Sequence, residues 1–126
     1  MKITEPSTRD EFKRYYDLRW KILRAPWNQP RGSEQDELEQ SSHHLMVTGD
    51  NHAVIAVGRL HFNSVREAQI RYMAVAADRQ RKGVGTLLLK ALEKRAVEHG
   101  AARIVLDARE TALGFYRKNN YKPAGP

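Results

Sequence analysis

A basic, glycine-containing loop separates a predicted strand from a predicted amphipathic helix, and this succession constrains the fold more than any other feature. The strand is expected over residues 69–75, where Ile70, Tyr72 and Ala74 alternate with more polar side chains and make one side apolar. After the loop, leucine and alanine recur at four-residue spacing up to His99 and predict a helix with one apolar side. A helix of this kind, directly after a strand, is expected to pack on the sheet that contains the strand.

The loop itself spans residues 79–86 and reads Arg-Gln-Arg-Lys-Gly-Val-Gly-Thr. A helix N-terminus carries partial positive charge and unpaired backbone N–H groups, so basic residues just before it are unfavourable by themselves. A bound anion would reverse the sign of that interaction, and Gly83 and Gly85 would let the backbone approach phosphate oxygens closely. The alternative is a basic turn exposed to solvent. Because charge, glycine and a helix start coincide, the loop is predicted to bind phosphate.

The spacing of the loop residues discriminates between classes of phosphate ligand. A Walker-type loop, Gly-x-x-x-x-Gly-Lys-Ser/Thr, is absent, and a dinucleotide fingerprint would need a third glycine where Leu88 stands. Residues 80–85, by contrast, fit the pattern Gln/Arg-x-x-Gly-x-Gly/Ala completely, after a strand that ends in Met-Ala-Val. This segment resembles the acyl-CoA-binding motif of the GNAT superfamily of N-acyltransferases.

A second segment, residues 109–121, resembles another motif of the same superfamily, Asn-x-x-Ala-x-x-x-Tyr-x-x-x-Gly-Phe. Ala112 and Tyr116 match this motif, while Asn120 and Tyr121 replace its glycine and phenylalanine. Asparagine also enters the left-handed region, so the first replacement is compatible with the same turn. The segment begins with arginine where the family often has asparagine, which removes one side-chain hydrogen bond expected for pantetheine.

The resemblance implies one acyltransferase-like domain over residues 1–126, of the α/β class, with a GNAT-like mixed sheet and helices on both faces. The order of predicted elements, antiparallel strands first and then strand–helix–strand–helix, agrees with this fold. Family members continue with a final strand beside the fifth, whereas this chain stops at Pro126, so that strand is expected to be missing. An unpaired edge beside an apolar strand favours association, and we expect a homodimer or poor solubility.

The resemblance also implies a direct transfer of an acetyl group from acetyl-CoA to a primary amine. Main-chain groups of Met73, Ala74 and Val75 would bind pantetheine and polarise the thioester carbonyl. The pyrophosphate would be held by main-chain N–H groups of the loop and the helix start, from residues Arg81, Lys82, Gly83, Val84, Gly85 and Thr86. Tyr116 would protonate the leaving thiolate, since a phenol of pKa about 10 and a thiol of about 8.5 exchange a proton readily. The alternative for Tyr116 is a core aromatic residue.

No general base is assigned. Family members often use a glutamate on the fourth strand, and Gln69 stands in that position, which leaves His61, Glu67 or a chain of waters as alternatives. His43 and His44 are adjacent on a predicted strand, so they point to opposite faces and cannot bind one ion together. No metal site is expected.

Two polar segments carry further local predictions. Ser7 is expected to cap the first helix, with Asp10 completing a capping box. An acidic run from Glu34 to Glu39 is expected on a short helical turn after Ser33, where it either faces solvent or attracts a cationic amine acceptor.

Composition narrows the function classes. The chain has no apolar run of about eighteen residues and no apolar leader after Met1, so neither a membrane partner nor a signal peptide is expected. With no cysteine, it has no disulfide and no thiol nucleophile, and a cytoplasmic location is predicted. A net charge of +7 favours an anionic partner. A nucleic-acid-binding module is one alternative, although the basic residues gather at a glycine loop rather than among aromatics. A CoA-binding sensor without catalysis is another, because Gln69 cannot act as a base.

Overall fold

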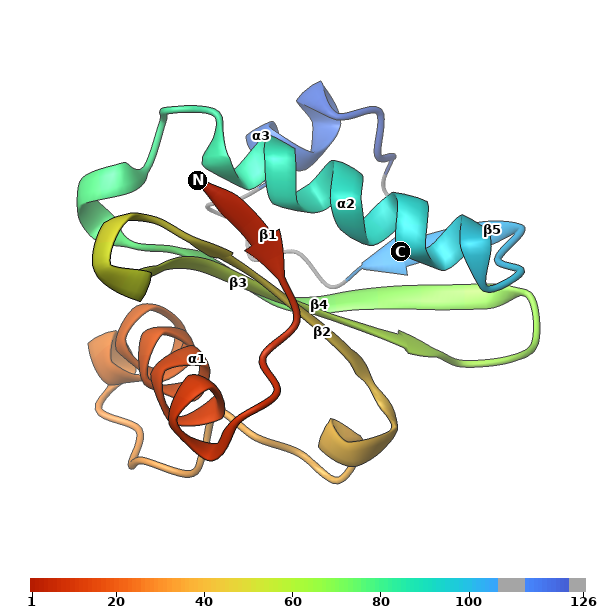
Figure 1. Cartoon of the computed structure of the whole chain (residues 1–126). Helices are drawn as coiled ribbons and strands as arrows, with labels where there is room; N and C mark the ends of the chain where they lie inside the picture. The colour runs from red at the N-terminus through yellow and green to blue at the C-terminus, as the bar shows by residue number, and fades with distance from the viewer. Residues whose placement is uncertain (107–112, 123–126) are drawn as a thin grey trace.

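The computed structural model describes residues 1–106 and 113–122, which form one five-stranded sheet with helices on both faces (Figure 1). The strands, in their order across the sheet, are β1 Lys2–Thr4, β2 His43–Thr48, β3 Val54–Phe62, β4 Glu67–Val75 and β5 Arg103–Leu106. The helices are α1 Arg9–Leu23, α2 Val84–Glu98 and α3 Leu113–Lys118, with short 3₁₀ turns η1 Ala25–Trp27, η2 Glu39–Ser41, η3 Asp50–His52 and η4 Ala77–Arg79. No helix in the described ranges is long and apolar enough to cross a membrane.

The sheet is mixed, as the sequence predicted. Strands β1 to β4 pair antiparallel in chain order, and β5 pairs parallel to β4 after the crossover through α2. Helix α1 covers one face of the sheet, and α2 and α3 cover the other (Figure 1). The predicted α/β class and the predicted arrangement of helices on both faces are therefore confirmed.

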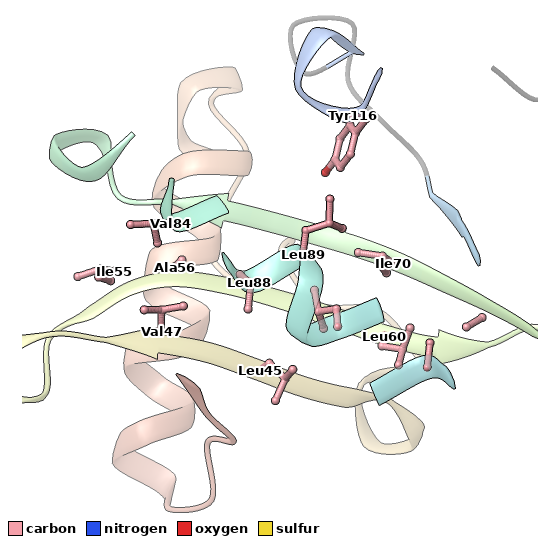
Figure 2. Packing of buried hydrophobic residues seen from close by; sticks show 13 residues of the cluster. Leu45, Val47, Ile55, Ala56, Leu60, Ile70, Val84, Leu88, Leu89 and Tyr116 are labelled. Atoms are coloured by element: carbon pink, nitrogen blue, oxygen red, sulfur yellow. The ribbon is translucent and has the colours of Figure 1, made fainter. Parts of the chain in front are cut away.

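Two apolar clusters hold these layers together, one on each face of the sheet. On the α2 face, the leucines of the helix stripe and the inward side chains of the strands are almost fully buried; they include Leu88, Leu89, Leu92, Leu60 and Ile70 (Figure 2). On the α1 face the cluster contains Tyr15, Leu18, Met46, Val57 and Ala74. Each fully buried leucine contributes about 1.5–3 kcal/mol relative to an exposed one, so the predicted leucine stripe of α2 is a main anchor of the fold.

Helix α1 begins one residue later than the sequence predicted. Thr8, rather than Ser7, is the N-cap: the backbone N–H of Glu11 donates to Thr8 Oγ1, and the backbone N–H of Thr8 donates to Glu11 Oε1, both at 3.0 Å. The capping box is therefore Thr8 with Glu11, and the predicted pair of Ser7 with Asp10 is wrong. Ser7 contributes by donating to the same carboxylate.

Strand β4 contains a bulge that the predicted alternation did not include. Val57 pairs with Ala74 and Arg59 with Arg71, so β4 has one residue more than β3 between these two pairs. Tyr72 has a left-handed φ of 57° at this point. An extra residue reverses the alternation of faces. Residues 70, 73 and 75 consequently lie on the α2 face, whereas Ala74 lies on the α1 face, and the predicted grouping of residues 70, 72 and 74 on one side is wrong.

The acidic run does not form the predicted helical turn; only η2, at its end, is helical. Its carboxylates bind the backbone of the same loop instead: the N–H of Leu38 donates to Asp36 Oδ1 at 2.9 Å, and the N–H of Asp36 donates to Glu39 Oε2 at 3.1 Å. Side-chain acceptors that bind nearby N–H groups compete with helical hydrogen bonding. The conformation of this loop is therefore fixed by hydrogen bonds from its own backbone to these carboxylates, and it is not helical.

Candidate functional site

The start of α2 offers unsatisfied backbone donors. Gly83 is the N-cap, no side chain in the described residues caps it, and the first turn holds no acidic residue. The N–H of Leu87 is the first to bond within the helix, to Gly83 O at 3.0 Å, which leaves those of residues 84–86 directed out of the helix end. Arg81 and Lys82 lie beside them and are exposed. The basic side chains and the glycine therefore lie directly at the start of α2, as the sequence indicated.

The two glycines of the loop differ in their roles. Gly83 has a left-handed φ of 81°, and a Cβ there would meet nothing within 4 Å, so it supplies the turn and leaves the space above it open. A Cβ on Gly85 would instead lie 3.3 Å from Phe115 Cζ and 3.6 Å from Val75 Cγ2. Gly85 thus lets α3 pack closely on the start of α2, and only its backbone N–H is available to a ligand.

The open edge of β4 lies next to this helix start in the chain. In the described residues β5 pairs with β4 only from Glu67 to Ile70, so the end of β4 has no described strand on that side. The N–H of Ala76 donates to Ile55 O at 2.8 Å, and since hydrogen-bonded pairs alternate in antiparallel strands, the backbone groups of Val75 point away from β3. Gln80 Nε2 donates to Val75 O at 3.0 Å, which leaves the N–H of Val75 at the open edge.

Tyr116 lies at the boundary between the apolar core and this region. Its side chain is 9% exposed and packs in the α2-face cluster, with its ring 5.1 Å from Phe115 and 6.0 Å from Tyr121 (Figure 2). Burial raises the pKa of the Tyr116 phenol above its ordinary value, so the hydroxyl keeps its proton at neutral pH. Tyr116 is thus both a core aromatic and a group able to donate a proton.

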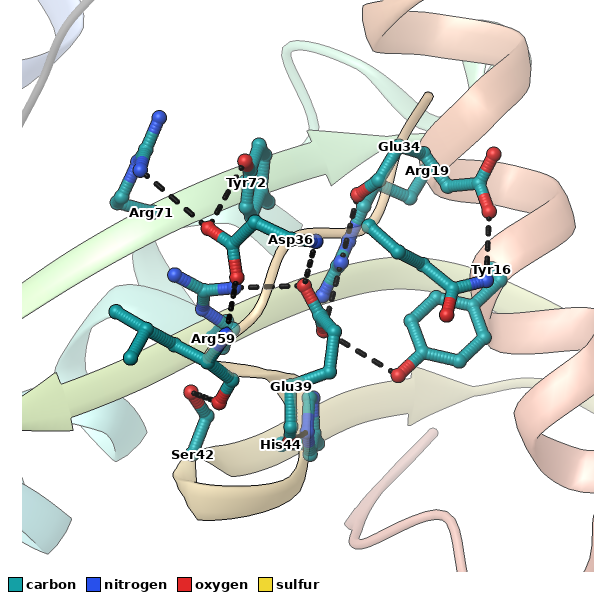
Figure 3. A network of polar contacts seen from close by, with 12 residues as sticks. Tyr16, Arg19, Glu34, Asp36, Glu39, Ser42, His44, Arg59, Arg71 and Tyr72 are labelled. Carbon is teal, nitrogen blue, oxygen red and sulfur yellow. Dashed lines mark hydrogen bonds and ion pairs between the residues drawn. The ribbon is translucent and has the colours of Figure 1, made fainter. Parts of the chain in front are cut away.

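Arginines and carboxylates form a network on the α1 face (Figure 3). Arg59 Nη1 donates to Asp36 Oδ1 and to Glu39 Oε2, each at 2.6 Å, and Arg19 Nη1 donates to Glu39 Oε1 at 3.0 Å. The side chains of both arginines are fully buried. Burial acts to raise the pKa of Asp36, but the hydrogen bonds from Arg59 and from the backbone N–H of Leu38 outweigh it and hold this pKa well below its usual range. Asp36 therefore stays ionised at neutral pH.

This network revises the interpretation of the acidic run. Glu39 is buried and bonded to arginines, and Glu34 is buried, accepting from the N–H of Gly32 at 2.8 Å. Of the residues from 34 to 39, Glu37 remains an exposed carboxylate. The run is therefore not a solvated helix face, and the charges of Asp36 and Glu39 are already balanced by buried arginines.

A groove of about 690 Å³ opens on the α1 face. Its walls include Phe12 and Tyr16, which stack at 5.8 Å, together with Asp36, Glu37 and His43. Residues 79–86 do not line it. The prediction of a phosphate site consequently depends on the backbone of the loop and not on this groove.

The alternatives for a general base differ in their geometry. The two ring nitrogens of His61 are both engaged: Arg59 Nη2 lies 3.3 Å from Nδ1 and Asn63 Oδ1 lies 3.0 Å from Nε2. An arginine can only donate, so Nδ1 is the acceptor and its lone pair is occupied. Glu67 lies six residues before Met73, roughly 20 Å along the strand at about 3.3 Å per residue. Gln69 accepts from Asn63 Nδ2 at 3.0 Å. None of these three residues has the geometry of a free base next to the end of β4.

The other histidines agree with the expectation from strand alternation. His44 lies under α1, where its Nδ1 is 2.9 Å from the hydroxyl of Tyr15, whereas the ring of His43 lies 4.5 Å from that of His99. In the part of the chain that the structure describes, no group of three or more candidate ligands for a metal occurs.

Sequence reasoning missed the two buried arginines, although the pattern contains a signal for each. Arg19 falls on the apolar stripe of α1, in line with Tyr15, Leu18 and Ile22, and Arg59 interrupts the apolar run of β3. A charged residue at a core position needs a partner of opposite charge. The carboxylates of the acidic run are the partners of these two arginines, so the sequence contained both halves of the network.

Comparison with known proteins agrees with this architecture. The sequence profile of the Acetyltransferase (GNAT) family matches residues 12–121. The uncharacterized N-acetyltransferase YjcF of Bacillus subtilis (strain 168) is 30% identical over 122 residues, which are 97% of this chain and 86% of the relative. The fold and the family match together define an acetyltransferase-type domain, and this chain belongs to the GNAT family.

Solved structures with the same fold include two aminoglycoside acetyltransferases. The aminoglycoside antibiotic 6′-N-acetyltransferase AAC(6′)-IG from Acinetobacter haemolyticus superposes with a TM-score of 0.78 at 20% identity, covering 100% of this chain and 94% of the other. An aminoglycoside 6′-N-acetyltransferase complexed with coenzyme A superposes with a TM-score of 0.81 at 18% identity, covering 99% and 87%. At these identities the likeness concerns the fold.

Proposed function

We propose that this chain is an acetyl-CoA-dependent N-acetyltransferase, in which a primary amine attacks the thioester directly. The observation that carries the proposal is the start of α2, which no described side chain caps, with its open glycine and basic neighbours. It follows a strand end that has no neighbouring strand on one side among the described residues. Membership of the GNAT family and the CoA complex of a structural neighbour support the same assignment. When bound, acetyl-CoA would supply the activated acetyl group.

The pyrophosphate would be held by the loop and helix start. The backbone N–H groups of residues 84–86 point out of the helix, where the partial positive charge of α2 favours an anion. The open space at Gly83 admits phosphate oxygens to the backbone, and the exposed side chains of Arg81 and Lys82 add charge. In this arrangement Gly85 acts through its N–H, because its other side packs on Phe115.

The thioester would lie along the end of β4, where Met73, Ala74 and Val75 bind the pantetheine arm. The N–H of Val75, which faces the open edge, is the donor best placed to stabilise negative charge on the carbonyl oxygen. Tyr116 would donate its proton to the departing thiolate, because its phenol is protonated at neutral pH.

The experiment is a calorimetric titration of the chain with acetyl-CoA and with CoA, followed by thiol-release assays across a library of primary amines. Lys82→Glu should weaken acetyl-CoA binding by about ten-fold or more, because it reverses a charge beside the helix start. Lys13→Glu, an exposed change of the same charge on α1, is the matched control and should leave the affinity unchanged. Absence of binding by any CoA species would overturn the proposal.

A CoA-binding protein without catalysis is the second candidate, and one observation favours it. Gln69 occupies the strand position where the family often has a glutamate base, and the lone pair of the neighbouring His61 is occupied by Arg59. Binding of acetyl-CoA without thiol release across the amine library would support this alternative. Turnover with any amine would exclude it.

A further inference from the structure

Tyr72 has a backbone conformation that a bulky residue rarely adopts. Its φ is 57°, and among the non-glycine residues with positive φ in the described ranges, it is the one that lies inside a strand. The left-handed region disfavours bulky side chains, and such a conformation persists only where the surroundings enforce it. Surrounding contacts must therefore hold Tyr72 in place.

A cage of charged groups provides these contacts (Figure 3). The guanidinium carbons of Arg19, Arg59 and Arg71 lie 4.6, 4.8 and 4.8 Å from the centroid of the Tyr72 ring. Contacts of this length between a cation and an aromatic ring are attractive. The hydroxyl of Tyr72 donates to Asp36 Oδ2 at 3.3 Å. Three elements and the loop of the acidic run thus converge on one side chain.

The bulge at Tyr72 decides which residue faces the open edge. Leu60 pairs with Ile70, and in an uninterrupted register Ala56 would pair with residue 74; the extra residue brings Val75 there instead. The backbone N–H groups of successive residues point to opposite sides of a strand. The loss of the bulge would therefore turn the N–H of Val75 toward β3. The cage and the proposed thioester donor are therefore linked through the conformation of Tyr72.

We propose that the cage around Tyr72 is a positioning device for acyl transfer. By holding the left-handed conformation, it keeps the bulge in register and aims the N–H of Val75 at the site of the thioester carbonyl. Tyr72, Arg59 and Asp36 are thus positioning residues that act through the backbone of β4. The inference depends on the proposed function for its chemical consequence, but the conformational step can be measured without it.

The test compares two small substitutions at the same position. Tyr72→Ala removes the cage contacts and leaves a residue that avoids positive φ, whereas Tyr72→Gly removes the same contacts but adopts positive φ readily. We expect Tyr72→Ala to lower kcat at saturating acetyl-CoA by about ten-fold or more, because small displacements of reacting groups have large effects on rate. Tyr72→Gly should recover most of this loss. A glycine variant as slow as the alanine variant would overturn the proposal.

Amide hydrogen exchange at Val75 gives a second measurement that needs no activity. In the parent chain this N–H should exchange faster than that of Ala76, which bonds to Ile55. Tyr72→Ala should protect Val75 by about ten-fold or more, and Tyr72→Gly should retain the parent pattern. An unchanged pattern in Tyr72→Ala would overturn the inference whether or not the chain binds CoA, whereas a failure of CoA binding with the expected exchange pattern would overturn only the proposed function.

Tyr72→Phe covers the case in which Tyr72→Ala does not fold. It keeps the ring among the arginines and removes only the hydrogen bond to Asp36, so its kcat should stay within about three-fold of the parent. A loss as large as ten-fold would assign the effect to the hydrogen bond with Asp36 and overturn the role of the arginine contacts. Melting temperatures of all three variants separate stability from rate.

Discussion

Gly58 and Leu92 lie so close together that a methyl group on Gly58 would be 2.7 Å from Leu92 Cδ1. Gly58 is on β3, opposite the bulge of β4, and Leu92 is in the middle of α2. The contact sets how near the helix comes to the sheet.

Gly58→Ala should therefore lower the free energy of unfolding. Leu92 is fully buried and Met73 Cγ would be 3.3 Å from the new methyl group, so neither neighbour can move freely. Overpacking of this kind costs about 1–3 kcal/mol, which urea denaturation would measure. Gly49→Ala is the matched control, because its Cβ would be at an ordinary 3.7 Å from Ile55 Cγ2. Equal stability of the two variants would contradict the close approach.

Replacing Arg59 by methionine should have a still larger effect. The substitution leaves the carboxylates of Asp36 and Glu39 without their shared partner, and loss of one member of a buried ion pair costs about 3–5 kcal/mol. Asp10→Asn breaks an ion pair with Arg14, in which the side chain of Asp10 is 74% exposed and that of Arg14 is 39% exposed. This change should cost less than about 1 kcal/mol. The comparison uses chemical denaturation of both variants at the same pH. A loss for Arg59→Met as small as that for Asp10→Asn would show that the buried network adds little to stability.

Stability should decrease as the pH falls below about 6.5, in part through His44. Burial lowers the pKa of His44 in the folded state, despite the opposing hydrogen bond to the carbonyl of Glu39. The unfolded state consequently binds more protons just below the ordinary histidine pKa, so this contribution is present above about 6.5 and is lost as the pH falls from that value through the lower pKa of the folded state. Burial lowers the pKa of His43 and of His61 as well, which adds contributions of the same sign.

His44→Gln should reduce the slope of unfolding free energy against pH between about 7 and 5. Glutamine keeps a hydrogen-bond donor and an acceptor but does not titrate. Denaturation midpoints across this range measure the slope, and the exposed His52, replaced by asparagine because its φ is 59°, is the control. A slope identical to that of the parent would exclude His44 as a contributor.

Tyr116→Phe should slow turnover and spare binding. The substitution removes the proton donor, and general acid catalysis contributes about 10²–10⁴-fold, so a fall in kcat of at least about ten-fold is expected. The dissociation constant of acetyl-CoA should not change, since the ring remains in the core. Tyr121→Phe, which removes a hydroxyl bonded to Glu93 at 2.7 Å, is the control and should keep its kcat. An unaffected rate in Tyr116→Phe would remove the acid role from this residue.

Local features of the chain were predicted well because their causes are local. The leucine spacing of α2, the glycine before it and the basic residues beside it depend on helix geometry and on adjacent residues, and each has the predicted position. The order of elements then led to a mixed sheet, since a strand–helix–strand unit joins parallel strands.

The sequence by itself determined the order of the main strands and helices, and where charge and glycine meet at a helix start. Only the tertiary structure decided that Thr8 caps α1, that β4 bulges at Tyr72, and that the acidic run is the partner of Arg19 and Arg59. Each of these outcomes depends on contacts between residues distant in the chain or on a choice between neighbours of equal propensity. Pairing of buried charges and the register of strands are settled by packing in three dimensions, which no local pattern of residues specifies.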